Sequence, residues 1–363
     1  MWRYLGLGGH FAWLYLVIIH THVYPFFAIA YERGFVALGF SISLAVALML
    51  FLAWEALAPF MHRTALVVAI ISLTTAIGTG LYVVSYMVIY SPPFMLLAVM
   101  LAGAGNGLLT LFWGQLFSDV APAELARYVC GGLLCSSAMS FGLVLTDSWL
   151  MFIAVAFLPT LSAVVRPFAA GYTPRVRYPR VNPNRSFLAR HSVGWAVLGA
   201  CLGFFAVMPE SQDQLASHIA AVSLAVLLLF VVIAALLVFA LRTHPEKTAV
   251  LLYRIAIFAV ICGIFSFALG TGVLRFAGLA LVVSARFLFV GLSWLIHPRL
   301  YIAFGKVRIH AVGWITTLFY CGIALGVVLL IGAAPMVGGG PSAGSLVFLG
   351  LASVLLVLFL FVL

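Results

Sequence analysis

The chain has 363 residues, of which 66% are hydrophobic and only 7% are charged. An average soluble domain carries about 25% charged residues, so this composition excludes a water-soluble globular protein. The formal net charge of +10 would suit a nucleic-acid-binding protein, but the basic residues follow the connections between apolar runs and do not form one binding segment. We therefore expect an integral membrane protein whose main partner is the lipid bilayer and which does not bind nucleic acid directly.

Apolar runs long enough to cross a bilayer recur along the whole chain. About 20 residues of helix match the thickness of the hydrocarbon core, and backbone groups in lipid must be bonded within the protein. A run such as 224–241 is apolar on all sides, whereas the strands of a membrane barrel alternate with polar residues. The pattern predicts an all-α integral membrane protein with about twelve transmembrane helices. The expected spans are 11–31, 35–58, 65–90, 94–117, 128–146, 149–167, 193–208, 217–241, 249–268, 272–297, 309–333 and 344–363.

The orientation follows from the basic residues between these spans. Most of the 18 Lys and Arg residues fall in alternate connections, and only Arg33 and Arg275 lie near the opposite face. Connections on the cytoplasmic side of a membrane carry an excess of Lys and Arg. We expect a multi-pass protein of the cytoplasmic (inner) membrane, with the N- and C-termini both in the cytoplasm.

Two ionisable residues stand out in the first two expected spans. His20 lies near the middle of 11–31, and Glu55 is the only acid well inside a span. Ionisable groups are costly within a bilayer, so His20 is a candidate for ligand binding and Glu55 for proton coupling. The alternatives are a neutral histidine bonded to a neighbouring hydroxyl group and a glutamate that reaches the membrane interface.

The fourth expected span carries a stripe of polar and aromatic residues. Asn106, Thr110 and Trp113 follow one another at steps of four and three residues and share one helix face, while Gln115 points the other way. Their amide, hydroxyl and indole groups need partners that lipid does not supply. The stripe indicates the lining of a ligand-binding cavity, and hydrogen bonding between helices is the alternative.

One long hydrophilic stretch divides the chain into two sets of six expected spans. Its prolines block a continuous helix, and its arginines suit a linker beside acidic lipid headgroups. We expect an N-terminal six-helix bundle at 1–167, a basic cytoplasmic linker at 168–192 and a C-terminal six-helix bundle at 193–363.

A faint internal repeat supports this division. His10 recurs as His191, and Trp113 recurs as Trp294, at an offset of about 180 residues. The matches predict two six-helix repeats in parallel orientation, as in several transporter folds. Pairs of glycines at four-residue spacing predict close packing of helix backbones. These pairs are Gly103 with Gly107, Gly199 with Gly203, and Gly322 with Gly326.

Arg286 is the most informative residue of the second half. It lies near the middle of the tenth expected span, and Ser293 and His297 follow it on the same helical stripe. A cation at this depth indicates a ligand-binding site that attracts an anion. The alternative is a structural charge bonded to backbone carbonyl groups between helices.

The sequence gives no sign of catalysis or of a metal site. The five cysteines lie inside expected spans without a CxxC pair, so we read them as small buried apolar residues. No paired acids and no nucleophile with a base occur at a suitable spacing. We expect neither an enzyme nor a bound metal or cofactor.

The number of spans, the parallel halves and the basic central loop resemble the major facilitator superfamily over nearly the whole chain. The resemblance implies a transporter fold with a central cavity between two halves. The loop at 59–64, between the second and third expected spans, lacks the Gly/Asp/Arg-rich signature of that superfamily.

A narrower resemblance begins in the fourth expected span, at Gly103-Ala-Gly-Asn-Gly and Trp113-Gly-Gln-Leu-Phe-Ser. These segments are similar to the fourth span of membrane-embedded LuxR-type transcriptional regulators from actinobacteria, in which a facilitator-like region precedes a cytoplasmic helix-turn-helix domain. The helix-turn-helix domain is absent here, because the apolar residues 358–363 end the sequence. The resemblance implies a cytoplasmic effector domain after Leu363 as a partner.

Two functions follow from these observations. In the first, the protein binds a small anionic or amphipathic molecule in a central cavity between its halves and transports it. In the second, the same region is the membrane sensor of a LuxR-type regulator and binds a ligand without transporting it. The facilitator-like architecture favours the first function, and the regulator-like segment favours the second.

Overall fold

The protein is described by a computed structural model, and regular structure in the described residues is helical. The described residues are 2–19, 41–49, 60, 63–89, 91–117, 120, 122–146, 148–171, 185–207, 218–243, 245–304, 308–333, 350 and 353–354. The helices are α1 (Trp2–Ile19), α4 (Thr64–Val84), the π-helical segment η2 (Ser85–Ile89), α5 (Pro92–Phe117), α6 (Pro122–Val144), α7 (Ser148–Gly171), α8 (Arg185–Val207), α10 (Ile219–Thr243), α11 (Pro245–Leu269), α12 (Val273–Phe304) and α13 (Arg308–Ala333).

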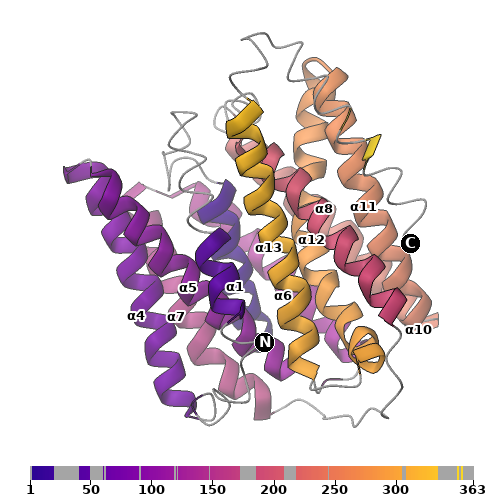
Figure 1. Ribbon diagram of the computed structural model, residues 1–363, viewed down its shortest axis with the longest axis horizontal. Coiled ribbons are helices and arrows are strands. Elements are labelled where there is room, and N and C mark those ends of the chain that lie inside the picture. The colour runs from indigo at the N-terminus through magenta and orange to yellow at the C-terminus, as the bar shows by residue number, and fades with distance from the viewer. Residues whose placement is uncertain are drawn as a thin grey trace.

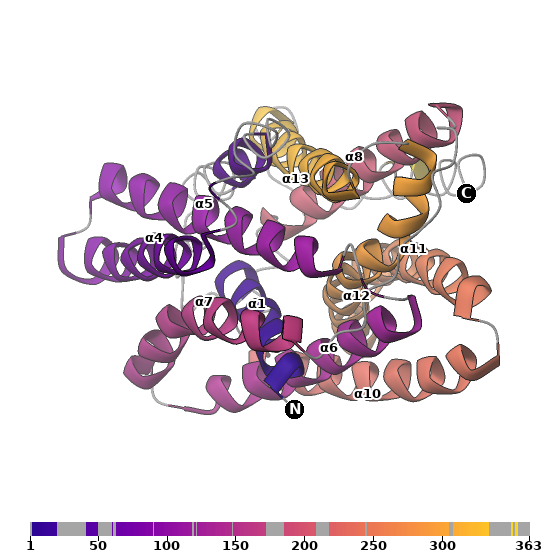
Figure 2. The same cartoon turned by 90° about the horizontal axis from the view of Figure 1, so that it is seen from below.

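The helices run side by side and gather into two groups (Figures 1 and 2). In the first group, α1 packs on α6 and α7, and α4 packs on α5. In the second group, α8 packs on α13, and α11 packs on α12. The two groups meet where α6 lies against α10 and α12. Contact between the groups therefore joins helices that are far apart in the chain.

The starts of the helices are repeated along the chain. Each of four early helices has a counterpart that begins about 180 residues later. The pairs are α1 with α8, α4 with α11, α5 with α12, and α6 with α13. Proline occupies the first helical turn of α5, α6 and α11, where its missing N–H costs nothing. The division of the chain at 168–192 stays a prediction.

The outer faces of the helices are apolar, as expected of a protein surrounded by lipid. Within the described part of the chain, five helices are long and apolar enough to cross a membrane: Thr64–Val84, Pro92–Phe117, Glu124–Val144, Trp149–Ala169 and Val273–Val290. On α7, Leu150, Ile153 and Phe157 are exposed, while Ser162 is fully buried. The helix thus turns its hydroxyl group inward and its large apolar side chains outward, the reverse of a soluble protein.

The first and seventh spans were predicted to begin at residues 11 and 193, but the observed helices begin earlier. Helix α1 starts at Trp2, where the sequence predicted residue 11, because glycines lower the hydropathy of the first turns. These glycines are packing residues: a Cβ atom on Gly8 would meet the Cβ atom of Cys135 at 2.6 Å. Helix α8 is 23 residues long and includes residues 185–192 of the predicted linker, because arginines at a helix end remain compatible with a helical backbone.

Close backbone contact holds α8 against α13. A Cβ atom on Gly199 would collide with the carbonyl oxygen of Phe319, and one on Gly203 would collide with that of Ile323. Gly322 of α13 faces the backbone of α8 in the same way. The colliding atoms belong to the backbone and cannot rotate aside. The expected role of Gly199, Gly203 and Gly322 in close packing is confirmed.

We predict that Gly199→Ala lowers the free energy of unfolding by about 1–3 kcal/mol, the usual cost of overpacking. Gly142→Ala is the matched control, because a Cβ atom on Gly142 would meet nothing within 4 Å. The control should be neutral or slightly stabilising, since alanine favours a helix more than glycine does. Thermal unfolding of both purified variants in detergent measures the difference. Equal midpoints would contradict the tight contact between α8 and α13.

Candidate functional site

A buried polar group joins α1 to α5. The hydroxyl group of Thr110 donates a hydrogen bond to the backbone carbonyl oxygen of Asn106 at 2.9 Å, and its oxygen lies 3.4 Å from Nε2 of His10. All three residues are buried. Because the hydroxyl proton is used toward the carbonyl group, Nε2 of His10 is the donor in its contact with Thr110. One of the residues expected to line a cavity, Thr110, therefore contacts a histidine.

The histidine at this position is His10, which the sequence marked only as part of the internal repeat. Residue 10 was expected to precede the first span, so its side chain was not expected to lie at depth. Helix α1 starts at Trp2, which places His10 in the middle of the helix. The glycines beside His10 could have revealed its depth, since small residues indicate a helix that packs closely against its neighbours.

The side-chain amide of Asn106 is the least satisfied polar group of this site. Its side chain is 0% exposed, and neither the amide oxygen nor the amide nitrogen has a hydrogen-bond partner among the described residues. A buried amide without partners is costly, and such a group in a native protein calls for a partner such as water or a ligand. Asn106 is therefore equipped to bind a polar molecule.

The other polar residues of α5 are bonded to α7. The indole Nε1 of Trp113 donates to Oγ of Ser162 at 2.8 Å. On the opposite face, Arg166 of α7 donates to the side-chain oxygen of Gln115 at 3.1 Å and to the carbonyl oxygen of Phe112 at 3.0 Å. These bonds fix α5 on α7. The single donor of Trp113 is thereby used within the protein.

Arg286 lies in the buried part of α12. Its side chain is only 8% exposed. Glu124 is the only acid whose side chain belongs to the described residues, and it is bonded to Arg127 at 2.6 Å. Within the described part of the chain, Arg286 therefore has no carboxylate partner. A cation in this position favours an anionic ligand.

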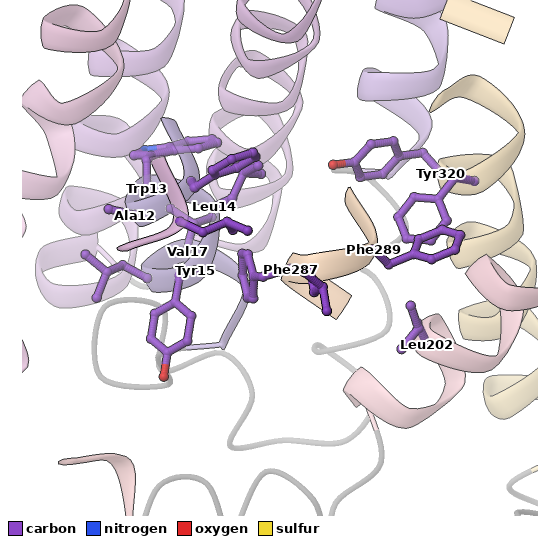
Figure 3. Packing of buried hydrophobic residues seen from close by; sticks show 14 of the residues in the cluster. Ala12, Trp13, Leu14, Tyr15, Val17, Leu202, Phe287, Phe289 and Tyr320 are labelled. Atoms are coloured by element: carbon purple, nitrogen blue, oxygen red, sulfur yellow. The ribbon is translucent and has the colours of Figure 1, made fainter. Parts of the chain in front are cut away.

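Residues next to Arg286 connect α12 to both groups of helices. The rings of Phe287 and Tyr15 on α1 lie with their centroids 5.3 Å apart, and those of Phe289 and Trp195 on α8 lie 4.4 Å apart. Figure 3 shows Phe287 on the side of Tyr15 and Phe289 on the side of Tyr320. Arg286 thus lies on one of the helices through which the two groups are in contact.

Tyr15 also forms a hydrogen bond between the two groups. Its hydroxyl group lies 2.9 Å from the hydroxyl oxygen of Ser223 on α10, and both side chains are buried. One residue of α1 therefore contacts α10 through its hydroxyl group and α12 through its ring.

The remaining candidates are not placed by the structure. His20 and Glu55 lie outside the described residues. Ser293 and His297 lie on the helical backbone of α12, where side chains are not described. Their expected roles stay predictions.

The described residues offer no metal site. No group of three or more His, Cys, Asp or Glu side chains that could hold a metal ion lies within them. All five cysteines are present as free thiols, each buried or partly buried.

No protein-family model and no curated protein match the sequence, whereas the structure matches solved transporters over its full length. It is similar to the human organic anion transporter MFSD10 (TETRAN), with a TM-score of 0.67, 13% sequence identity, and coverage of 99% of this chain and 98% of that chain. It is similar to the nucleoside transporter NupG, with a TM-score of 0.59, 15% identity, and coverage of 100% and 98%. It is also similar to XylE, a proton:xylose symporter of the major facilitator superfamily, with a TM-score of 0.59, 12% identity, and coverage of 100% and 94%.

These matches confirm the predicted all-α membrane architecture and the resemblance to the major facilitator superfamily. The structures named are all transporters, so the resemblance to LuxR-type regulators stays a prediction from the sequence. At sequence identities of 12–15%, the similarity to these structures concerns the fold alone. The chain has the multi-pass helical fold of the major facilitator superfamily transporters.

Proposed function

We propose that this protein binds a small organic anion between its two six-helix halves and transports it across the cytoplasmic membrane. The observation that carries this proposal is Arg286, a buried cation without a carboxylate partner among the described residues. Its neighbour Phe287 contacts Tyr15 of the opposite half. A ligand held at Arg286 would therefore lie close to the contact between the halves.

The chemistry of Arg286 suits a carboxylate ligand. A guanidinium group stays charged, and it binds carboxylates through two parallel hydrogen bonds. Burial in a medium of low dielectric constant strengthens its attraction for an anion. The fold adds support, because the human transporter that the structure resembles is described as an organic anion transporter.

Transport in this fold requires the halves to move against each other around the ligand. The contact between α6 and α10, together with the hydrogen bond between Tyr15 and Ser223, holds the halves in the observed arrangement. We place both termini in the cytoplasm, in keeping with the basic connections. Helices α5 and α12 then run inward from Pro92 and Val273, and Ser223 lies near the outer end of α10.

The LuxR-type sensor remains the alternative, and transport measurements separate the two functions. Both predict ligand binding at Arg286. Only a transporter accumulates or exchanges the ligand in sealed proteoliposomes. Binding without uptake would favour the sensor.

We predict that Arg286→Gln weakens anion binding at least about tenfold, since hydrogen bonds to charged groups contribute about 1.5–3 kcal/mol. The measurement is thermal stabilisation of the purified protein by sodium hippurate, because a ligand that binds the folded state raises the unfolding temperature. Methyl hippurate, which has no charge, should not stabilise the protein. Uptake of labelled hippurate into proteoliposomes should be lost in parallel.

Arg275→Gln is the control on the same helix. Nε of Arg275 donates to the carbonyl oxygen of Phe267 at 3.3 Å, so its role is structural. This variant should unfold at a lower temperature but keep the response to hippurate. An unchanged hippurate response in Arg286→Gln would remove the anion site.

We predict that Tyr15→Phe shifts the protein toward a state that is open near the start of α10. The variant keeps the ring that contacts Phe287 and loses the hydrogen bond to Ser223, which contributes about 0.5–1.5 kcal/mol. Spin labels on Leu145 and Val273, which are 64% and 83% exposed, report the separation between the halves. Their distance should increase in the variant.

A label pair within one half is the control for this measurement. Val88 and Leu145 are 76% and 64% exposed and belong to the same group of helices. Their distance should be the same in the wild type and in Tyr15→Phe. A change in both pairs would indicate local unfolding, and a change in neither pair would contradict the role of the hydrogen bond.

A further inference from the structure

We propose that the side-chain amide of Asn106 forms a second binding site, which recognises a carboxamide group on the organic anion held by Arg286. This inference rests on the proposed function, and it adds the chemical class of the substrate: an anion with a primary carboxamide group. Both polar atoms of the Asn106 amide are buried and have no hydrogen-bond partner among the described residues.

The packing of α5 fixes the direction of Asn106. A Cβ atom on Gly105 would meet the backbone nitrogen of Thr75 on α4 at 3.1 Å. A Cβ atom on Gly107 would meet Cβ of Ala47 at 2.6 Å. Because both flanking residues are held in close contact, α5 is not free to turn the amide of Asn106 toward another helix. A hydrogen-bond partner must therefore reach the amide in its observed position.

The internal repeat places Asn106 at the depth of the Arg286 region. Counted from the first residue of each helix, Asn106 of α5 takes the same position as Phe287 of α12, the neighbour of Arg286. Phe287 contacts the opposite half through Tyr15. Asn106 and Arg286 both lie about 20 Å along their helices. In two parallel halves, these positions are at the same depth in the membrane.

The surroundings of Asn106 determine which group it binds. The Thr110 hydroxyl proton is directed to the backbone carbonyl of Asn106, so this hydroxyl is not a donor for the ligand. The amide itself has an N–H donor and an oxygen acceptor side by side. A primary carboxamide satisfies both at once, because its oxygen and one of its N–H groups lie on the same side of the C–N bond, whereas a ketone satisfies only the donor.

Two matched compounds test this inference on the purified full chain. Succinamate and levulinate are carboxylates of the same shape, but the second has a CH₃ group in place of the amide NH₂. We expect the wild type to bind succinamate about tenfold more tightly, because the oxygen of Asn106 stays unpaired with the ketone. The readout is the shift in unfolding temperature as a function of concentration of each compound.

Two variants assign the preference to Asn106. Asn106→Leu should bind both compounds equally, and it should not unfold at a lower temperature than the wild type, since the amide makes no bond to a described residue. Gln115→Leu removes an amide from the same helix that is bonded to Arg166. This control should unfold at a lower temperature and keep the preference for succinamate.

The outcomes separate this inference from the proposed function. Equal binding of the two compounds by the wild type overturns the carboxamide site alone and leaves the anion site at Arg286 intact. An unchanged preference in Asn106→Leu also overturns the carboxamide site. If neither compound stabilises the wild type, this inference fails, and the response to hippurate decides whether the anion site fails with it. If Asn106→Leu does not fold, the wild-type comparison of the two compounds decides.

Discussion

The structure depends on one constraint: lipid forms no hydrogen bonds, so every polar group at depth must find a partner inside the protein. The backbone meets this requirement by forming helices along the described spans. Side chains meet it by bonding across helices, as Trp113 does to Ser162 and Arg166 does to Gln115. The apolar side chains are then free to face outward, as Leu150 and the other exposed residues of α7 do.

The same constraint separates structural from functional polar residues. Trp113 and Gln115 have partners on α7 that hold two helices together. The amide of Asn106 has no such partner among the described residues. Arg286 has no carboxylate partner among the described residues. Both groups are costly to bury unpaired. A molecule that pairs with both would recover that free energy on binding, so these two residues are the best candidates for ligand binding.

The sequence predicted the parts of the fold that the bilayer dictates. Continuous apolar runs predicted the helices, and the four-residue spacing of Asn106 and Thr110 predicted their common face. Helix ends were less predictable, because glycines that pack against neighbours lower the hydropathy of the start of α1. That error concealed the depth of His10. The contact of Tyr15 with Ser223 joins residues 208 positions apart, and no local pattern encodes such a pair. Arg286 was identifiable because a charge at midspan is rare.

The two kinds of helix contact differ in a way that suits movement. Within the second group of helices, Gly199 and Gly203 bring backbones into contact, and rigid atoms leave no room for sliding. Between the two groups, Tyr15 bonds a serine and packs against the ring of Phe287. Hydrogen bonds between membrane helices contribute only about 0.6 kcal/mol on average, so such a contact can break and re-form. Two conformations that differ by a few kcal/mol interconvert when a ligand favours one of them. An anion that pairs with Arg286 on one half and with Asn106 on the other would favour the conformation that brings both residues onto it.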